Sequence, residues 1–285
     1  MRKKLKDRLL AQEAMEVFNS YDIVGDIAII KTPREDIDSA KKAAEAILKL
    51  YPHKVKTVLL QTGAVQGDFR VRELKFLAGE EKSITFHKES GCSFKVDVKN
   101  CYYSPRLLFE HQRVANLVLP KEVVINMFAG IGCFSVFIGQ KVESAKVYSI
   151  DINSAAYDCM KDNVKINKVE DQVIPLLGDS KYIIASRLCG IADRVLMPLP
   201  ELALEYLPYA LKALKAKGGW IYYYDFEHAM KTEDPLEKSM IKVKEKLNYM
   251  GINFEIAYSR IIRSTGPNWY QTVLDIYVAN LPDKF

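Results

Sequence analysis

The chain has 285 residues, enough for one large and one small domain. Hydrophobic residues make up 49% and charged residues 27%, a composition typical of a globular protein. Its formal net charge of +5 permits a polyanionic partner without requiring one. No apolar run reaches the roughly 18 residues of a membrane span, and the basic N-terminus lacks the apolar core of a secretion signal, so we expect a cytoplasmic protein.

Cysteine and histidine usage argues against a metal centre. The five cysteines are scattered and form no C-x-x-C pair, which favours a reducing compartment. The four histidines also lack metal-ligand spacing, so we predict no bound metal.

The first 100 residues predict a small α+β domain. Hydrophobic spacing indicates helices at 1–20 and 36–50, strands at 23–30, 55–61 and 70–77, and a hairpin at 83–98. The first helix is basic, and docking by its apolar side is a more ordinary role for it than binding nucleic acid. No low-complexity linker follows, so we expect domain 1–100 to pack closely on domain 101–285.

A connecting helix is predicted over 104–118. Ser104 can cap it, and Pro105 falls in the first turn, where a missing N–H costs nothing. Glu110 lies away from the apolar face of this helix. A single glutamate in such a position is usually solvated or ion-paired, so spacing alone is weak support for catalysis.

The centre of the chain is a strand, a glycine turn and a helix. The β-branched run from Val123 to Asn126 precedes Phe128-Ala129-Gly130-Ile131-Gly132, and an apolar helical pattern resumes at Phe134. This geometry lets a ligand approach the backbone at the carboxyl end of a buried parallel strand. The alternative is a plain turn that needs glycine for its backbone angles alone.

An acidic residue at the end of the next strand indicates which ligand fits. Residues 146–150 are predicted as that strand, which ends in Asp151, about 20 residues beyond the glycine turn, where a carboxylate can accept from both ribose hydroxyls. The turn has no third glycine spaced to admit a pyrophosphate, which disfavours a dinucleotide. S-adenosyl-methionine is therefore the better candidate.

The rest of the chain alternates strands and helices. Helices are predicted at 154–167, 183–188, 201–216 and 235–250, and strands at 172–177, 193–197, 220–224, 254–263 and 270–279. Five βα repeats followed by a β-hairpin specify an α/β fold, a mainly parallel doubly wound sheet with an antiparallel end. Class I methyltransferases, which are Rossmann-like, end in this way, and dinucleotide dehydrogenases rarely do.

Ligands of such sheets collect at the carboxyl ends of the strands. Asp151 would hold the ribose there, Asp179 would accept from the adenine amino group, and the backbone around Gly130 would line the methionine end. The turn Pro198-Leu199-Pro200 faces the reactive centre, so we expect it to line the substrate pocket. The predicted cofactor-binding residues are Phe128, Ala129, Gly130, Gly132, Asp151, Ile152, Asn153, Gly178 and Asp179.

Four segments resemble the archaeal and eukaryotic tRNA (guanine-37-N1)-methyltransferase family. They are 102–110, 126–132, 149–153 and 173–179, and the similarity runs from about Tyr21 onward. Close relatives include enzymes that methylate the tricyclic wyosine precursor at the same nucleotide, and more distant ones transfer the aminocarboxypropyl group of S-adenosyl-methionine. The resemblance implies a class I methyltransferase domain behind a small N-terminal α+β domain, and a monomer whose partner is tRNA.

The resemblance also implies roles for individual residues. Glu110 would take the proton from guanine N1, and Arg70 would stabilise the charge that develops on guanine O6. Tyr102 and Arg106 would shape the pocket for the cofactor and for a base that has left its stack in the anticodon stem-loop.

Two features depart from the family pattern. The family's Asn-Leu-Pro turn is Pro198-Leu199-Pro200 here, and proline has neither a side-chain amide nor an N–H, so guanine recognition must be rearranged or the preferred base is a modified one. The family often carries a further N-terminal domain that checks the tRNA elbow. The chain has no room for it, so we expect looser dependence on tRNA shape, with phosphate contacts made by the small N-terminal domain.

Three hypotheses follow. The first is methyl transfer to the purine at position 37 of tRNA, on N1 of guanosine or on the wyosine precursor. The second keeps the fold, the cofactor and the tRNA but transfers the aminocarboxypropyl group, which requires attack at another carbon of the same sulfonium. The third is a tRNA-binding protein that has lost its catalytic activity.

Overall fold

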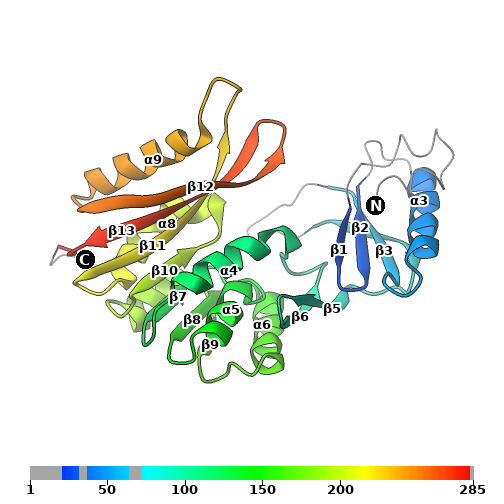
Figure 1. Ribbon diagram of the computed structural model, residues 1–285, viewed down its shortest axis with the longest axis horizontal. Coiled ribbons are helices and arrows are strands. Elements are labelled where there is room, and N and C mark those ends of the chain that lie inside the picture. The colour runs from blue at the N-terminus through cyan, green and yellow to red at the C-terminus, as the bar shows by residue number, and fades with distance from the viewer. Residues whose placement is uncertain (1–20, 32–36, 64–71, 283–285) are drawn as a thin grey trace.

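The computed structural model describes residues 21–31, 37–63 and 72–282. Two parts lie side by side along the long axis of the molecule, a small sheet with one helix and a large sheet with helices on both faces (Figure 1). The helix predicted at 1–20 and the predicted site residue Arg70 lie outside the described residues. None of the helices in the described ranges is long and apolar enough to cross a membrane.

The N-terminal sheet has the strand order β1-β2-β3-β4, and helix α3 packs against it. Its elements are β1 (Asp22–Val24), β2 (Ile27–Ile30), α3 (Ile37–Leu50), β3 (Thr57–Gln61) and β4 (Leu74–Gly79). The single strand predicted at 23–30 is wrong, because the chain turns back at Gly25. This glycine has φ +55°, and a Cβ there would lie 2.1 Å from Thr85 Oγ1, so only glycine fits. The strand predicted at 70–77 is observed at 74–79.

Strands β5 (Ile84–Glu89) and β6 (Cys92–Asp97) form the predicted hairpin. Two asparagines, one in helix α6 (Ser154–Ile166) and one at the C-cap of that helix, bond to the edge of β6. Asn163 bonds to the backbone N–H and C=O of Lys95, and Asn167 bonds to those of Ser93, at 2.6 to 3.1 Å. On the other side of the hairpin, the Thr85 hydroxyl contacts the β1–β2 turn. The hairpin therefore fastens the small sheet to the large one.

The large sheet has the strand order β12-β13-β11-β10-β7-β8-β9. Strands β7 to β11 are parallel, and β13 pairs antiparallel with β11 and β12, which confirms the predicted doubly wound sheet with an antiparallel end. The strand order reverses between β7 and β10, where such sheets bind ligands. The strands are β7 (Val123–Asn126), β8 (Lys146–Asp151), β9 (Val173–Leu177), β10 (Arg194–Met197), β11 (Gly218–His228), β12 (Phe254–Gly266) and β13 (Trp269–Ala279).

Helices cover both faces of the large sheet (Figure 1). One face carries a 3₁₀ turn (Pro105–Leu107), α4 (Leu108–Leu117), α5 (Cys133–Lys141) and α6, and the other carries α7 (Ser180–Ile183), α8 (Pro200–Ala213) and α9 (Pro235–Tyr249). The helix predicted at 183–188 is instead α7 followed by a π-helical turn at 184–188. The helix predicted at 201–216 ends earlier, at Ala213.

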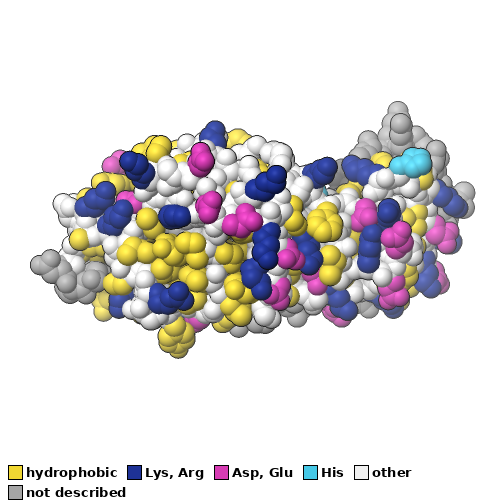
Figure 2. Space-filling model, turned by 90° about the horizontal axis from the view of Figure 1, so that it is seen from below, with side chains coloured by type: hydrophobic (Ala, Val, Ile, Leu, Met, Phe, Trp, Pro, Cys, Tyr) yellow, Lys and Arg dark blue, Asp and Glu magenta, His cyan; other side chains and the backbone are white. Residues whose placement is uncertain are grey.

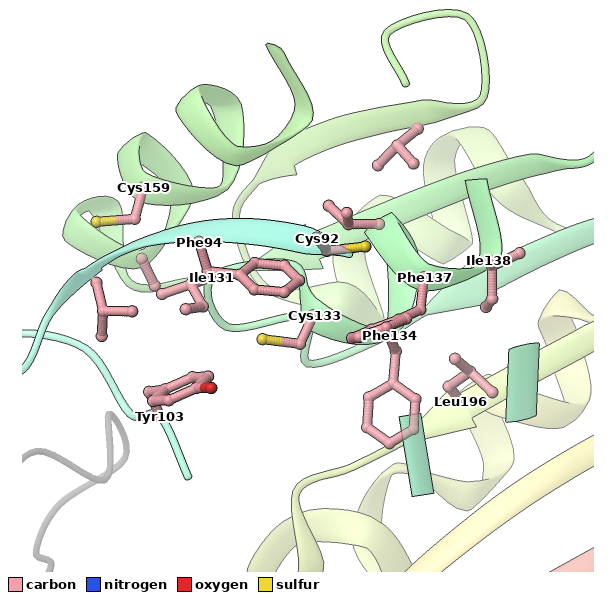
Figure 3. Close-up of a cluster of buried hydrophobic side chains, with 14 of the residues drawn as sticks. Cys92, Phe94, Tyr103, Ile131, Cys133, Phe134, Phe137, Ile138, Cys159 and Leu196 are labelled. Atoms are coloured by element: carbon pink, nitrogen blue, oxygen red, sulfur yellow. The ribbon is translucent and has the colours of Figure 1, made fainter. Parts of the chain in front are cut away.

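One hydrophobic cluster joins the two parts of the molecule. Cys92 and Phe94 of β6 pack with Phe134 and Phe137 of α5, and Leu196 of β10 belongs to the same cluster (Figure 3). The ring centroids of Phe94 and Phe137 are 5.9 Å apart. Because this core is shared, α5 and the turn that precedes it are held against the N-terminal hairpin.

A buried hydrogen-bonded carboxylate also links the hairpin to α4. The Glu89 carboxylate accepts from the Tyr103 hydroxyl (2.6 Å) and contacts His111 Nδ1 (2.9 Å), and only 2% of the Glu89 side chain is exposed. Burial raises the pKa of Glu89, but the hydrogen bonds from His111 and Tyr103 outweigh burial, so the pKa lies below its ordinary value.

We expect Glu89→Gln to lower the free energy of unfolding by about 2 kcal/mol at neutral pH, because it removes a buried carboxylate that is hydrogen-bonded to Tyr103 and His111. The lowered pKa means that this stabilisation is present above the ordinary value of 4.5 and is lost as the pH falls through the lower folded-state value. Urea unfolding at neutral and acid pH measures both effects. The control is Glu80→Gln, at a more exposed carboxylate. Equal losses in the two variants would contradict the assignment.

Candidate functional site

The glycine turn after β7 has the backbone that a close ligand needs. Gly130 and Gly132 have φ of +56° and +90°, values that residues with a Cβ rarely adopt. A Cβ on Gly132 would lie 2.9 Å from Met160 Cγ, so this glycine is needed for packing. A Cβ on Gly130 would meet only the carbonyl oxygen of Tyr102, at 3.8 Å. The Gly130 backbone therefore faces the segment that begins at Tyr102.

The Asp151 carboxylate is fixed beside this turn, at the end of β8. Its Oδ2 accepts from the Gly130 N–H (2.6 Å), and its Oδ1 accepts from the Asn153 N–H (2.9 Å). Burial raises the pKa of Asp151, and these two backbone bonds partly oppose that shift. Each oxygen keeps a lone pair, so the carboxylate can accept two hydroxyl groups. Asn153 caps α6 and also donates to the Asn100 carbonyl, which holds the segment in place.

Two exposed apolar side chains flank this acid. Ile152 follows Asp151 and is 52% exposed, and Leu177, the residue paired with Asp151 in β9, is 50% exposed. Aliphatic side chains at the carboxyl edge of a sheet provide the flat apolar contacts that an adenine ring requires. The sequence analysis missed Leu177, although its place at the end of an apolar strand was a usable signal.

Asp179 has protein partners of its own. It caps α7 through the Lys181 N–H (2.9 Å), and both of its oxygens accept from the Tyr206 hydroxyl at 3.1 Å. The ring of Tyr206 also lies 5.2 Å from that of Phe128, one of the predicted cofactor residues. Burial and then the Asp179 charge raise the pKa of Tyr206 to about 12. Tyr206, on α8, is a site residue that the sequence analysis missed.

The segment from Tyr102 to Arg106 is fastened to distant strands. Arg263 of β12 donates from Nη2 to the Tyr102 hydroxyl (3.0 Å) and from Nη1 to Ser104 Oγ (2.9 Å). Arg106 forms an ion pair with Asp22 of β1 at 2.8 Å. Nothing in the sequence near Tyr102 indicated Arg263, which lies 161 residues further along the chain.

Glu110 is buried, whereas the sequence predicted that it lies away from the core face of its helix. Only 1% of the residue is exposed. Its Oε1 accepts from Arg113 Nη2 (2.7 Å) and from the Tyr224 hydroxyl (2.8 Å), and its Oε2 accepts from Arg113 Nε (2.9 Å). This pairing matches the ordinary role of a helical glutamate, so a catalytic role must be compatible with the ion pair.

Strand register places Glu110 at the carboxyl edge of the large sheet. Strands β10 and β11 pair in parallel, so Tyr224 lies level with Pro198, the start of the turn after β10. The Tyr224 ring lies 5.9 Å from the ring of Phe134 in the first turn of α5. Because Tyr224 donates to Glu110, the carboxylate lies on the side of the sheet that carries α5, near the level at which β10 ends. The structure thus brings together Asp151, the Tyr102 segment and Glu110 at one edge.

Two family models match the chain. The TRM5/TYW2 methyltransferase domain matches residues 85–251, and the TYW2 N-terminal domain matches residues 1–82. The division between them falls just before the β5–β6 hairpin, which packs on α6 of the large sheet.

Three curated relatives differ in the reaction that their names give. The chain is 38% identical to tRNA (guanine(37)-N(1))-methyltransferase Trm5b of Pyrococcus abyssi, over 91% of this chain and 75% of the relative. It is 37% identical to tRNA 4-demethylwyosine(37)-methyltransferase Taw21 of Saccharolobus solfataricus, over 93% and 96%. It is 32% identical to a tRNA(Phe) (4-demethylwyosine(37)-C(7)) aminocarboxypropyltransferase of Methanocaldococcus jannaschii, over 90% and 96%.

Solved structures show the same architecture. A complex of aTrm5 and tRNALeu superimposes with a TM-score of 0.82 at 34% identity, covering 97% of this chain and 77% of that one. TYW2 of P. horikoshii in complex with MeSAdo superimposes with a TM-score of 0.79 at 26% identity, covering 98% and 99%.

Proposed function

The chain belongs to the TRM5/TYW2 methyltransferase family and uses S-adenosyl-methionine, and from this premise we propose that it methylates the purine at position 37 of tRNA, with Glu110 as general base. One observation carries the proposal. The Asp151 carboxylate, which is fixed by the Gly130 N–H, lies at the same sheet edge as the segment that contains Tyr102 and Glu110.

The residues at this edge suit the cofactor. Asp151 has lone pairs for both ribose hydroxyls, Ile152 and Leu177 offer apolar contacts to the adenine ring, and the open backbone at Gly130 admits the methionine end. Bound there, S-adenosyl-methionine supplies an electrophilic methyl group on a sulfonium.

The proposed reaction requires a proton acceptor. Guanine N1 carries a proton, which passes to a Glu110 carboxylate oxygen while the N1 electron pair forms the bond to the methyl carbon. The residues around Asp151 would hold S-adenosyl-methionine, which would supply the methyl group, keep the electrons of the carbon–sulfur bond on sulfur and depart as S-adenosyl-homocysteine. A carboxylate offers about four acceptor sites. Among the described residues, Arg113 and Tyr224 donate three hydrogen bonds to Glu110, so one acceptor site remains for the purine.

The turn Pro198-Leu199-Pro200 bears on which purine is preferred. Neither proline offers an N–H or a side-chain amide to a guanine edge. An apolar turn of this kind suits a larger base with fewer exposed polar groups, such as the demethylwyosine named for the Taw21 relative. We therefore keep guanosine N1 and the wyosine precursor as the two methylation targets.

Aminocarboxypropyl transfer is the second candidate function. Two observations favour it. Residues 1–82 match the TYW2 N-terminal domain, and the match to the aminocarboxypropyltransferase of Methanocaldococcus jannaschii covers 96% of that relative. Methyl transfer remains first because the Trm5b and Taw21 relatives are more similar in sequence.

The anticodon stem-loop of tRNA is the proposed macromolecular partner, because position 37 lies in it. Figure 2 shows that hydrophobic side chains gather over the large-sheet half of the lower face, while basic and acidic side chains are interspersed over the N-terminal half. A phosphate-binding surface is usually an unbroken basic one. We therefore expect the phosphate contacts on other faces. The monomeric state and the division of the chain at residue 100 stay predictions.

A position-specific assay tests the proposal. The protein and S-adenosyl-methionine are incubated with tRNA transcripts that carry guanosine or adenosine at position 37, and with tRNA that carries the wyosine precursor. Mass spectrometry of the digested RNA should locate one added methyl group at position 37 of the guanosine or the precursor tRNA and none on the adenosine transcript. Binding of cofactor and tRNA without any product would instead indicate the catalytically inactive alternative.

A further inference from the structure

Arg113 is shared between two buried carboxylates. Its Nε and Nη2 donate to Glu110, and its Nη1 and Nη2 donate to Asp275 of β13 at 2.6 and 2.9 Å. The side chains of Glu110, Arg113 and Asp275 are 2%, 12% and 6% exposed. One cation therefore faces two anions away from water.

Within the described ranges, no second cation directly contacts the triad formed by Glu110, Arg113 and Asp275. Tyr224 of β11 donates to Glu110, and the Arg113 guanidinium lies over the rings of Tyr222 and Tyr258, at 5.9 and 4.7 Å from their centroids. Arg194 of β10 acts on Asp275 at longer range, and its own ion-pair partner is Glu122. His111, the neighbour of Glu110 on α4, pairs with Glu89 instead.

Formal charges decide what the triad favours. With both carboxylates ionised its net charge is −1, which is costly in a buried site. A proton accepted by either carboxylate leaves Arg113 paired with one anion and makes the cluster neutral. Burial raises the pKa of Asp275, Arg113 lowers it, and the charge of Glu110 raises it again, as expected for two acids that share one counter-ion.

The strand register separates the roles of the two acids. Asp275 pairs with Tyr222, whereas Tyr224 pairs with Val273, so Asp275 lies deeper in the sheet than the carboxyl edge. Glu110, bound to Tyr224, lies at that edge. A purine that enters from the edge therefore meets Glu110 first, with Asp275 behind it.

We propose that Arg113 and Asp275 are positioning residues that make Glu110 a proton acceptor. Arg113 holds the Glu110 carboxylate in the core, and Asp275 supplies the second negative charge that Glu110 relieves when it takes a proton. Asp275 also keeps Arg113 paired with an anion once Glu110 has taken the proton. This inference rests on the proposed function of Glu110.

The two partners should shift the pH dependence of the reaction in opposite directions. Single-turnover methyl transfer is measured from about pH 5 to about pH 9 for each variant. Asp275→Asn removes the second negative charge, so the acid limb of the rate profile moves about one unit lower and the plateau rate falls about tenfold. Arg113→Gln removes the cation, so the limb moves higher, and Arg113→Lys restores part of the shift. A role confined to stability would leave the position of the limb unchanged.

Control variants separate failure of the proposed base from failure of the positioning proposal. Asp193→Asn changes an ion-paired acid at the opposite edge of the sheet and should leave the profile unmoved. Calorimetric cofactor binding and thermal unfolding show whether each variant is folded. If Glu110→Gln retains the wild-type rate, the proposed base is wrong. If Glu110→Gln is inactive while folded Asp275→Asn and Arg113→Gln have the wild-type limb, the positioning proposal alone is wrong.

Discussion

Glu110→Gln is expected to lower the single-turnover rate of methyl transfer by a factor of about 10² to 10⁴ while leaving cofactor affinity nearly unchanged. Glutamine has almost the same shape, and its Oε1 can still accept from Arg113 Nη2 and Tyr224. Its amide nitrogen replaces the acceptor of Arg113 Nε, and the amide cannot take the purine proton. The loss should therefore appear in the rate constant and not in the Michaelis constant for the cofactor.

The measurement is rapid-quench transfer of labelled methyl at saturating tRNA and cofactor. Glu122→Gln is a matched control, because Glu122 is also ion-paired to an arginine but lies at the start of β7, away from the carboxyl edge. A rate for Glu110→Gln within about twofold of wild type would mean that another group, or water, accepts the proton.

Asp151→Asn should weaken cofactor binding by a factor of about 10 to 100, which corresponds to the loss of one or two charge-assisted hydrogen bonds. An amide can accept on one side only, so its N–H₂ would meet the N–H of either Gly130 or Asn153, and it would also face a ribose hydroxyl that needs an acceptor. The expected defect is in affinity, because Asp151 is placed at the ribose and not at the transferred group.

Isothermal calorimetry with S-adenosyl-homocysteine measures this effect without turnover. The control is Asp158→Asn in α6, the helix that follows β8, because the Asp158 carboxylate is exposed. A stable Asp151→Asn protein with wild-type affinity would remove Asp151 from the cofactor site. Unchanged affinity together with normal turnover would also question whether the β7–β8 edge binds the cofactor.

The large sheet was predictable because each of its signals is local. The apolar run at 123–126, the glycines at 130 and 132 and the acid at 151 lie within one βαβ unit, and backbone geometry requires the two glycines. The terminal hairpin was predictable for a similar reason, since two long strand-like runs flank a Gly-Pro-Asn turn. These signals need no knowledge of distant contacts.

Predictions failed where tertiary contacts override a local pattern. The run at 23–30 looks like one strand, but it contains the Gly25 turn, which is set by close contact with Thr85 of the distant hairpin. The run at 183–188 looks like one helix, but residues 184–188 form a π-helical turn whose Ile184 and Leu188 belong to the same hydrophobic cluster as α8. In both cases the hydrophobic pattern fitted either outcome.

The partners of the candidate site were also beyond local reasoning. Glu110 was identified through a resemblance, but its burial and its link to Asp275 depend on α4 packing across β11 and β13. Arg263 reaches Tyr102 from β12, and Tyr206 reaches Asp179 from α8. Spacing along the chain carries no information about such pairs, because they depend on how distant helices and strands pack.

The central claim is that a cofactor held at Asp151 gives its methyl group to the purine at position 37 of tRNA. The most direct test uses two preparations of S-adenosyl-methionine, one labelled in the methyl group and one in the aminocarboxypropyl group, with the same tRNA. We predict that only the methyl label enters the RNA, at position 37, and that Glu110→Gln slows its entry by a factor of about 10² to 10⁴. Incorporation of the aminocarboxypropyl label, or of methyl at another nucleotide, would contradict the claim.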